Sequence, residues 1–130
     1  MQIIDGKNTI LGRLASHVAK EALKGEEIAI VNCEQIRITG KKKSIEKEFE
    51  AKRQRVGSAQ KGPKISRTSE KIVKRTIRGM LPSHKEGRGR EAFKRIKCYV
   101  GIPPEFKESE KITFKNETKL KSIKVKHLSK

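Results

Sequence analysis

The side chains best suited to chemistry in this sequence are cations, and they occur in clusters. Lys and Arg total 33 against 15 Asp and Glu, which gives a formal net charge of +18. A charge of this size opposes compaction through self-repulsion, so an anionic partner is the natural explanation. An arginine guanidinium binds two phosphate oxygens at once, and nearby glycines let a sugar–phosphate backbone come close. The residues therefore predict phosphate binding.

The charge is concentrated in the middle of the chain. Residues 1–40 hold five basic and five acidic residues, whereas residues 41–95 hold 19 basic and 6 acidic ones. Residues 96–130 hold 9 basic and 4 acidic ones. The first part is thus predicted to be an ordinary neutral domain and the middle a binding surface. The candidate binding residues in this middle part are Lys41, Lys42, Lys43, Arg53, Arg55, Lys61, Lys64, Arg67, Lys74, Arg75, Arg78, Lys85, Arg88 and Arg90.

The run from Thr39 to Ser44 resembles a nucleotide phosphate-binding loop only superficially. That loop needs a glycine five positions before the Gly of its Gly-Lys pair and a Ser or Thr directly after the lysine. Gln35 and Lys42 occupy those positions here. The lysines remain phosphate-seeking charge near a predicted helix start, where free backbone N–H groups point outward.

No catalytic, metal or cofactor motif is present. The histidines, His17, His84 and His127, are scattered without a partner motif, and an exposed imidazole is the ordinary interpretation of His17. Cys33 and Cys98 lie 65 positions apart without a Cys-x-x-Cys spacing, which predicts buried reduced thiols in core strands rather than a disulfide or a metal site. The sequence therefore predicts a protein that is not an enzyme and has no cofactor.

Membrane insertion and base stacking are also disfavoured. The longest apolar runs are far too short to span a bilayer, and the N-terminus lacks the pattern of a signal peptide, so a cytoplasmic protein is expected. Phe49, Phe93 and Tyr99 fall at predicted core positions. Exposed aromatic platforms for single-stranded bases are therefore not expected, which leaves recognition of the nucleic-acid backbone.

The first third of the chain predicts a βαβ unit. A short strand at Gln2–Asp5 precedes an amphipathic helix from Leu11 to Leu23, where apolar residues recur every three or four positions. Gly25 suits a left-handed helix cap. The apolar run Ile28–Cys33 is typical of a strand covered on both faces. A third strand at Gln35–Thr39 is possible.

The remaining elements are less regular. In chain order they are a highly charged helix at Lys41–Arg55, a basic loop near 53–67, a helix at Ser69–Met80, a flexible turn at Gly87–Gly89, a short helix at Arg90–Lys94 and a strand at Ile96–Val100. The predicted fold class is α/β, a three-layer α/β/α sandwich with a small, mostly parallel sheet. We expect one α/β domain over residues 1–106, followed by a basic C-terminal tail or edge segment over 107–130.

Four segments together resemble the L-thirteen family of large-ribosomal-subunit proteins. They run from Asp5 to Ser16, from Val31 to Gly40, from Arg75 to Pro82 and from Gly89 to Gly101, and they include the specific elements Leu-Gly-Arg-Leu-Ala and Gly-Met-Leu-Pro. The short, basic chain is similar to archaeal members, and the segment after Pro104 matches the family poorly.

This resemblance implies a four-stranded parallel sheet and a structural role without catalysis. The implied partners are large-subunit ribosomal RNA and neighbouring large-subunit ribosomal proteins, with the protein present as a monomer within the ribosome. The RNA contacts that it implies are Arg13, Lys41, Lys42, Arg78, Arg88 and Arg90.

Two other functions fit the sequence less well. An RNA-modifying enzyme on a doubly wound sheet would need a glycine-rich cofactor loop after the first strand, and Gly6–Gly12 has too few glycines at the wrong spacing. A DNA-binding regulator would need a recognition helix for the major groove. Lys41–Arg55 is the only candidate, and its three glutamates fit a DNA groove badly.

Overall fold

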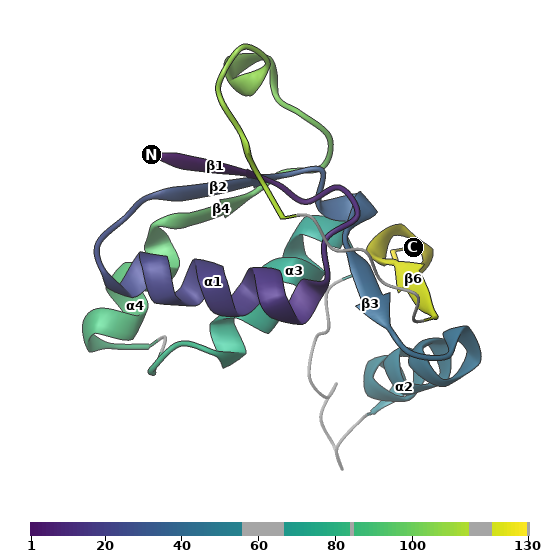
Figure 1. The fold of residues 1–130 in the computed structure, drawn as a ribbon. Coiled ribbons are helices and arrows are strands. Elements are labelled where there is room, and N and C mark those ends of the chain that lie inside the picture. Colours follow the sequence, from purple (N-terminus) through teal and green to yellow (C-terminus); the bar gives the residue numbers. More distant parts are fainter. Residues whose placement is uncertain (56–66, 84, 115–120, 130) are drawn as a thin grey trace.

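The fold is built around a four-stranded parallel sheet (Figure 1). The computed structural model describes residues 1–55, 67–83, 85–114 and 121–129. The strands of the main sheet lie in the order β4-β2-β1-β5 and are all parallel. Their bounds are β1 (Gln2–Asp5), β2 (Ile28–Val31), β4 (Ile96–Cys98) and β5 (Ile112–Thr113).

Three helices cover one face of this sheet, namely α1 (Leu11–Leu23), α3 (Ser69–Gly79) and α4 (Gly87–Lys94) (Figure 1). The sheet and helices share a continuous apolar core, in which Ile4, Ile30 and Val18 are fully buried. The predicted helix at Leu11–Leu23 is confirmed in both bounds. Gly25 has the predicted left-handed conformation, with φ of 102°.

The other face of the sheet carries a thinner layer. Ile3, Ala29 and Val31 form a second apolar cluster, against which Tyr99 and Phe106 pack. Phe106 ends a short 3-10 helix, η2 (Pro104–Phe106). The prediction of an α/β sandwich around a small parallel sheet is therefore confirmed, with outer layers of unequal thickness, and all four residues of β2 are buried as predicted.

The strand predicted at Ile28–Cys33 was too long by two residues. Asn32 adopts a left-handed conformation with φ of 56°, and Cys33 then begins a 3-10 helix, η1 (Cys33–Gln35). Asparagine tolerates this conformation better than most residues, and here its amide donates a hydrogen bond to Asp5 Oδ1 at 2.9 Å. Cys33 is buried as predicted, although it lies outside the strand.

A second, two-stranded sheet lies beside the main one. The possible third strand is present as β3 (Arg37–Thr39), but it pairs antiparallel with β6 (Ser122–Lys124) rather than joining the main sheet. A 3-10 helix, η3 (Val125–His127), follows β6. Ile123, Val125 and Leu128 are buried in the main core, so the C-terminal segment is packed against the domain.

The charged helix is confirmed as α2 (Lys42–Gln54), and no residue in it is buried. It lies beside the small sheet, at the far end of the molecule from α4 (Figure 1). Ile45 and Phe49 are half-buried and pack against the core, which fixes α2 to the domain. Each helix in the described ranges is too short or too polar to span a lipid bilayer.

The flexible turn predicted at Gly87–Gly89 is wrong, because these residues form the first turn of α4. Gly89 is needed there for close approach rather than for flexibility. A Cβ at this position would lie 2.4 Å from the carbonyl oxygens of Pro82 and Ser83. The segment between α3 and α4 therefore crosses directly over the start of α4.

Candidate nucleic-acid interface

Many of the predicted cations, together with four others, lie in two regions of the molecule. The first lies beyond the carboxyl ends of the parallel strands, and we call it the β3–β6 basic surface. The second region comprises cations of α3, of α4 and of the segment between them, and we call it the α3–α4 basic surface. The members of the first are Lys7, Arg37, Lys41, Lys42, Lys43, Lys121 and Lys124, and those of the second are Arg75, Arg78, Lys85, Arg88 and Arg90.

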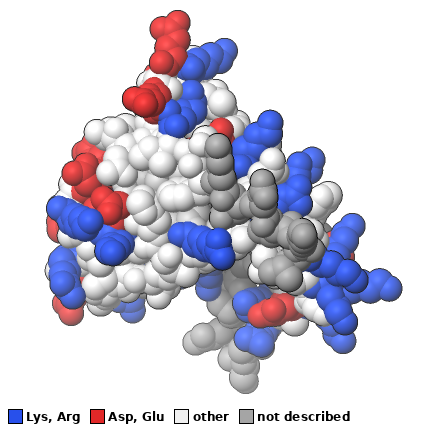
Figure 2. All heavy atoms as spheres, viewed as in Figure 1, with Lys and Arg blue, Asp and Glu red and all other residues white. Residues whose placement is uncertain are grey.

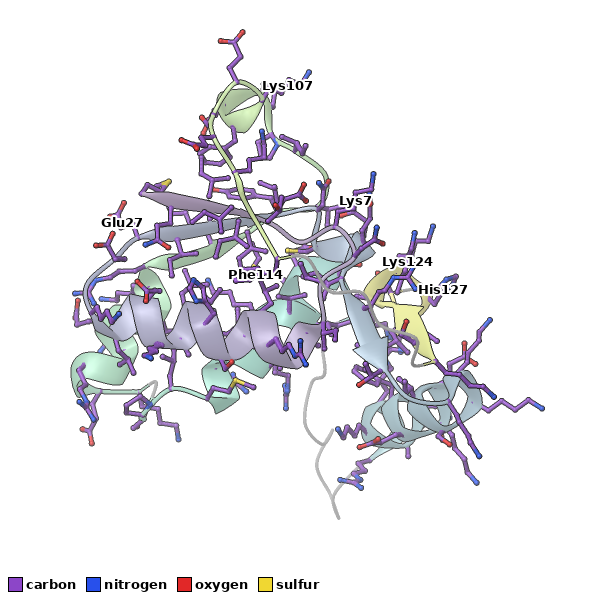
Figure 3. All side chains as sticks on the ribbon, viewed as in Figure 1. Lys7, Glu27, Lys107, Phe114, Lys124 and His127 are labelled. Atoms are coloured by element: carbon purple, nitrogen blue, oxygen red, sulfur yellow. The ribbon has the colours of Figure 1, made fainter. Side chains whose placement is uncertain are left out.

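The pairing of β3 with β6 brings the first surface together. Arg37 lies opposite Lys124 in the strand register, and the backbone N–H of Gly40 donates to the carbonyl oxygen of Lys121 at 2.8 Å. Lys41 and Lys121 line one open hollow on the surface. Figure 3 shows Lys7 and Lys124 on this same side of the molecule. Cations far apart in the sequence thus share one surface.

Arg37 is held in place by two side-chain hydrogen bonds. Its Nε donates to Asn8 Oδ1 at 3.3 Å, and its Nη1 donates to Ser122 Oγ at 3.2 Å. Asn8 belongs to the loop after β1 and Ser122 to β6. The guanidinium therefore ties the main sheet to the small sheet while it adds charge to the surface.

The β3–β6 basic surface has little compensating negative charge. Residues 35–45 and 121–129 contain no Asp or Glu. Lys41, Lys42 and Lys43 form no salt bridge within the described part of the chain. Figure 2 shows carboxylates on the left and at the top of the view as well as a few among the cations on the right, and the labelled Glu27 in Figure 3 lies at the opposite, amino end of the strands. Positive charge therefore predominates beyond the carboxyl ends of the parallel strands, whereas Glu27 lies at their amino ends.

Three helices begin with cations. The N-termini of α1, α2 and α4 have no side-chain cap and no acidic residue in the first turn. Those turns contain Arg13 in α1, Lys42 and Lys43 in α2, and Arg88 and Arg90 in α4. Because the free N–H groups already make a helix N-terminus positive, cations there are unfavourable unless an anion is bound.

Helix α3 is the internal contrast. It has Glu70 in its first turn and Arg78 in its last turn, which is the arrangement that the helix dipole favours. The helix dipole alone therefore accounts for the charged residues at the ends of α3, but not for the cations in the first turns of α1, α2 and α4. The N–H groups of the first turns and the cations together make the starts of α1 and α2 positive and suited to a phosphate group, whereas the N-cap residue of α4 is Glu86.

Two predicted cations make internal contacts instead. The Nη2 of Arg53 donates to the carbonyl oxygen of Leu128, which ties α2 to the C-terminal segment. Glu46 and Glu50 line the same hollow as Arg53, so this part of α2 is poorly suited to an anion. The ammonium of Lys74 lies 4.7 Å from the ring centre of Phe93, which links α3 to α4.

The other predicted residues are exposed or lie outside the described ranges. Lys61 and Lys64 are outside the described residues, and Arg55 and Arg67 are exposed on either side of that gap. Arg13, Arg75, Lys85, Arg88 and Arg90 are exposed, and Arg78 is half-buried.

Four members of the β3–β6 basic surface were missed from the sequence. They are Lys7, Arg37, Lys121 and Lys124. The available signal was the absence of acidic residues from 121–129, but nothing local indicates that this segment pairs with residues 37–39.

The remaining polar and aromatic residues show no catalytic arrangement. His17 is half-buried rather than exposed, and its ring lies 5.0 Å from that of Phe114. Phe49, Phe93 and Tyr99 are half-buried, and Phe49 and Tyr99 pack against the two apolar clusters. Among the described residues, His, Cys, Asp and Glu form no group of three or more that could hold a metal ion.

Comparison with known proteins identifies the family. The family model described as "Ribosomal protein L13" matches residues 1–105. The "Large ribosomal subunit protein uL13" of Methanocaldococcus jannaschii is 49% identical over 100% of this chain and 96% of its own length. Its namesake in Methanosarcina barkeri is 51% identical over 87% of this chain and 80% of its own. The protein of the same name in Methanopyrus kandleri is 54% identical over 78% of this chain and 62% of its own length. The chain belongs to the ribosomal protein L13 family.

Proposed function

We propose that this protein is a structural component of the large ribosomal subunit, where it binds ribosomal RNA. The observation that carries the proposal is the occurrence of cations in the first turns of α1, α2 and α4, in a member of this family. Its place is the cytoplasmic ribosome, as a single copy beside other large-subunit proteins. Its role is to hold RNA rather than to catalyse a reaction.

The two basic surfaces suit RNA segments rather than a compact anion. Helices α2 and α4 lie at opposite ends of the domain (Figure 1), so one RNA strand segment would meet the β3–β6 basic surface and another the α3–α4 basic surface. Phosphate contacts fix register and orientation without reading the base sequence. A rigid sheet between the two surfaces would hold the two segments at a set separation.

The residues that we propose to contact phosphate lie in the first turns of helices, on the two surfaces or, for Arg55 and Arg67, on either side of the gap in the described residues. The site predicted from the sequence keeps Arg13, Lys41, Lys42, Lys43, Arg55, Arg67, Arg75, Arg78, Lys85, Arg88 and Arg90, and gains Lys7, Arg37, Lys121 and Lys124. Arg53 and Lys74 are proposed to support the helices rather than to bind RNA, because their side chains already have partners.

The proposal is tested by the salt dependence of binding to a transcript of large-subunit ribosomal RNA. In the triple variant Lys41→Gln, Lys42→Gln, Lys43→Gln, we expect weaker binding and a log–log salt slope less steep by about 2 to 3, because each phosphate contact contributes about 0.7 to 0.9. Binding can be measured by filter retention over a series of salt concentrations.

The matched control is Lys20→Gln, Lys97→Gln, Lys107→Gln, which removes the same charge from exposed lysines outside both surfaces. We expect this control to keep the slope of the unaltered protein. Equal slopes for both triple variants would contradict the proposed surface and leave only non-specific attraction. Equal affinity for duplex DNA and ribosomal RNA would favour a DNA-binding regulator instead.

A further inference from the structure

The two cysteines lie side by side although 65 positions separate them in the sequence. Cys98 ends β4, and its register partner in β2 is Ile30. The chain then turns back at the left-handed Asn32, which places Cys33 next to the end of β4. The backbone N–H of Cys33 donates to the carbonyl oxygen of Tyr99 at 3.2 Å.

Both side chains belong to the same core, since Cys33 is one of its buried members and Cys98 packs against it, and neither is in a disulfide. Cys33 is fully buried and its thiol also lies 3.6 Å from the carbonyl oxygen of Ile30, to which it donates. Cys98 is only half-buried, so reagents in solution reach it first. The hydrogen bond with Cys98, together with burial, raises the pKa of the Cys33 thiol well above its ordinary value.

We propose that Cys33 and Cys98 form an oxidisable pair that a small-molecule disulfide converts into one intramolecular disulfide. Two cysteines on adjacent, hydrogen-bonded backbone segments, with both side chains packed into one core, are placed to reach the S–S bond length of about 2.0 Å by side-chain adjustment. This inference does not depend on RNA binding, because it rests on the packing of the β2 and β4 ends alone.

The reaction occurs in two balanced exchange steps. The thiolate of Cys98 attacks the small disulfide, forming a mixed disulfide and releasing one small thiolate. The sulfur of Cys33 then attacks the Cys98 sulfur and releases the second small thiolate, which takes up the proton of Cys33 and leaves as a thiol. The two cysteines are oxidised and the small disulfide is reduced to two thiols.

The product would join the carboxyl end of the edge strand β4 to the start of η1, just after the inner strand β2. This junction lies where the chain leaves β2 for η1 and leaves β4 for the 99–111 segment. Both segments are already hydrogen-bonded there, since Glu34 Oε2 accepts from the backbone N–H of Gly101 at 3.0 Å. Oxidation would therefore fix an existing contact rather than rearrange the fold.

The test uses the unaltered, full-length chain and oxidised glutathione as the probe. After incubation of the folded protein, the sample is acid-quenched, unfolded and alkylated, and its intact mass and linked peptides are measured. We expect a monomer that has lost two hydrogen atoms and both alkylatable thiols, with a peptide joining Cys33 to Cys98. Two alkylated thiols, or only intermolecular disulfides, would overturn the proposal.

Single-cysteine variants test the order of the two steps. In Cys33→Ser we expect a mixed disulfide between glutathione and Cys98, whereas in Cys98→Ser the buried Cys33 is expected to stay alkylatable. Equal glutathione addition to both variants would overturn the assignment of Cys98 as the entry thiol.

A sample unfolded in urea provides the control for the fold. There we expect mixed disulfides to replace most of the intramolecular product, because the thiols are no longer held together. The same yield of intramolecular disulfide in urea would show that the native packing of β2 and β4 does not bring about the reaction.

Discussion

At the scale of single residues, the cations in the first turns of α1, α2 and α4 oppose the helices that carry them. A cation at a helix N-terminus is destabilising by about 0.3–1 kcal/mol at the surface, where an acidic residue would be stabilising. Lys42 and Lys43 sit in such a turn, beside the uncapped N-terminal residue Lys41. Positions that weaken the free protein and suit an anion are the ones expected to touch RNA.

The variant Lys43→Glu tests whether a lysine at this position lowers the stability of the free protein while it strengthens RNA binding. We expect its free energy of unfolding to rise by about 0.5–1 kcal/mol in the free protein, because a carboxylate replaces an ammonium at the helix start. Its affinity for ribosomal RNA should fall. Urea denaturation measures the first effect and filter binding the second.

The control for this variant is Lys47→Glu, which makes the same charge change in the middle of α2. Its gain in unfolding free energy should be smaller, because the helix dipole acts mainly within the first and last turns. A loss of stability in Lys43→Glu would show that the lysines in the first turn of α2 do not destabilise the helix.

An interface residue could be predicted when the residues that define its role are close to it in the sequence. Lys41 to Lys43 were found because they are adjacent in the sequence, and Arg88 and Arg90 because glycines flank them. Lys121 and Lys124 were missed because their role follows from the β3–β6 pairing. The cysteine pair was missed for the same reason, since strand register and the Asn32 turn bring Cys33 to Cys98.

At the scale of elements, the segment between α3 and α4 sets the position of the second basic surface. The Gly-Met-Leu-Pro stretch ends α3, and the chain then passes over Gly89 in the first turn of α4. This crossing keeps Arg88 and Arg90 exposed at the helix start. The glycine was predicted to give flexibility, yet it allows tight packing, a distinction that needs the neighbouring backbone.

The variant Gly89→Ala should therefore be destabilised. A Cβ at this site would meet backbone atoms of Pro82 and Ser83, which cannot move aside as a flexible side chain does. We expect a loss of about 1–3 kcal/mol in unfolding free energy, as for other overpacked sites. Thermal or urea unfolding followed by circular dichroism measures the change.

The matched control is Gly12→Ala in α1, where an added Cβ meets nothing within 4 Å. Alanine in a helix is favoured over glycine by about 0.5–1 kcal/mol, so this variant should be more stable. If both variants gained stability, the close crossing over Gly89 would be contradicted.

The elements that were predicted well are those with local periodicity. Helices α1 and α3 have enough apolar positions to show a helical period, and strand β2 was recognised as an unbroken apolar run; the predicted bounds of all three were close. Strands β3 and β5 contain three and two residues. Strands this short show no period, so only their tertiary pairing defines them.

At the scale of the whole molecule, the C-terminal segment joins both sheets to the core. Strand β5 adds an edge to the main sheet, and Ile123, Val125 and Leu128 are buried with the helices. The division into a domain over 1–106 and a segment over 107–130 stays a proposal about how the chain is organised. The burial of these three side chains indicates that the two parts depend on each other.

Removal of residues 107–130 tests that dependence. We expect the shortened chain to lose cooperative unfolding or a large part of its stability, because burying one aliphatic side chain is worth about 1.5–3 kcal/mol. Heat or urea unfolding of the shortened and full-length chains measures the difference. A shortened chain with unchanged stability would show that the segment is a dispensable arm.

The pairing of β1 with β5 has a consequence for the order of events during synthesis. Ile4 pairs with Ile112, which is made 108 residues later. At roughly 5–20 residues per second, translation needs about 4 to 16 s to proceed from the end of β2 to β5. Throughout that interval one edge of β1 has no neighbour, and an open strand edge is a template for joining another chain. A nascent chain of this protein is therefore exposed to mispairing at this edge until β5 has been made.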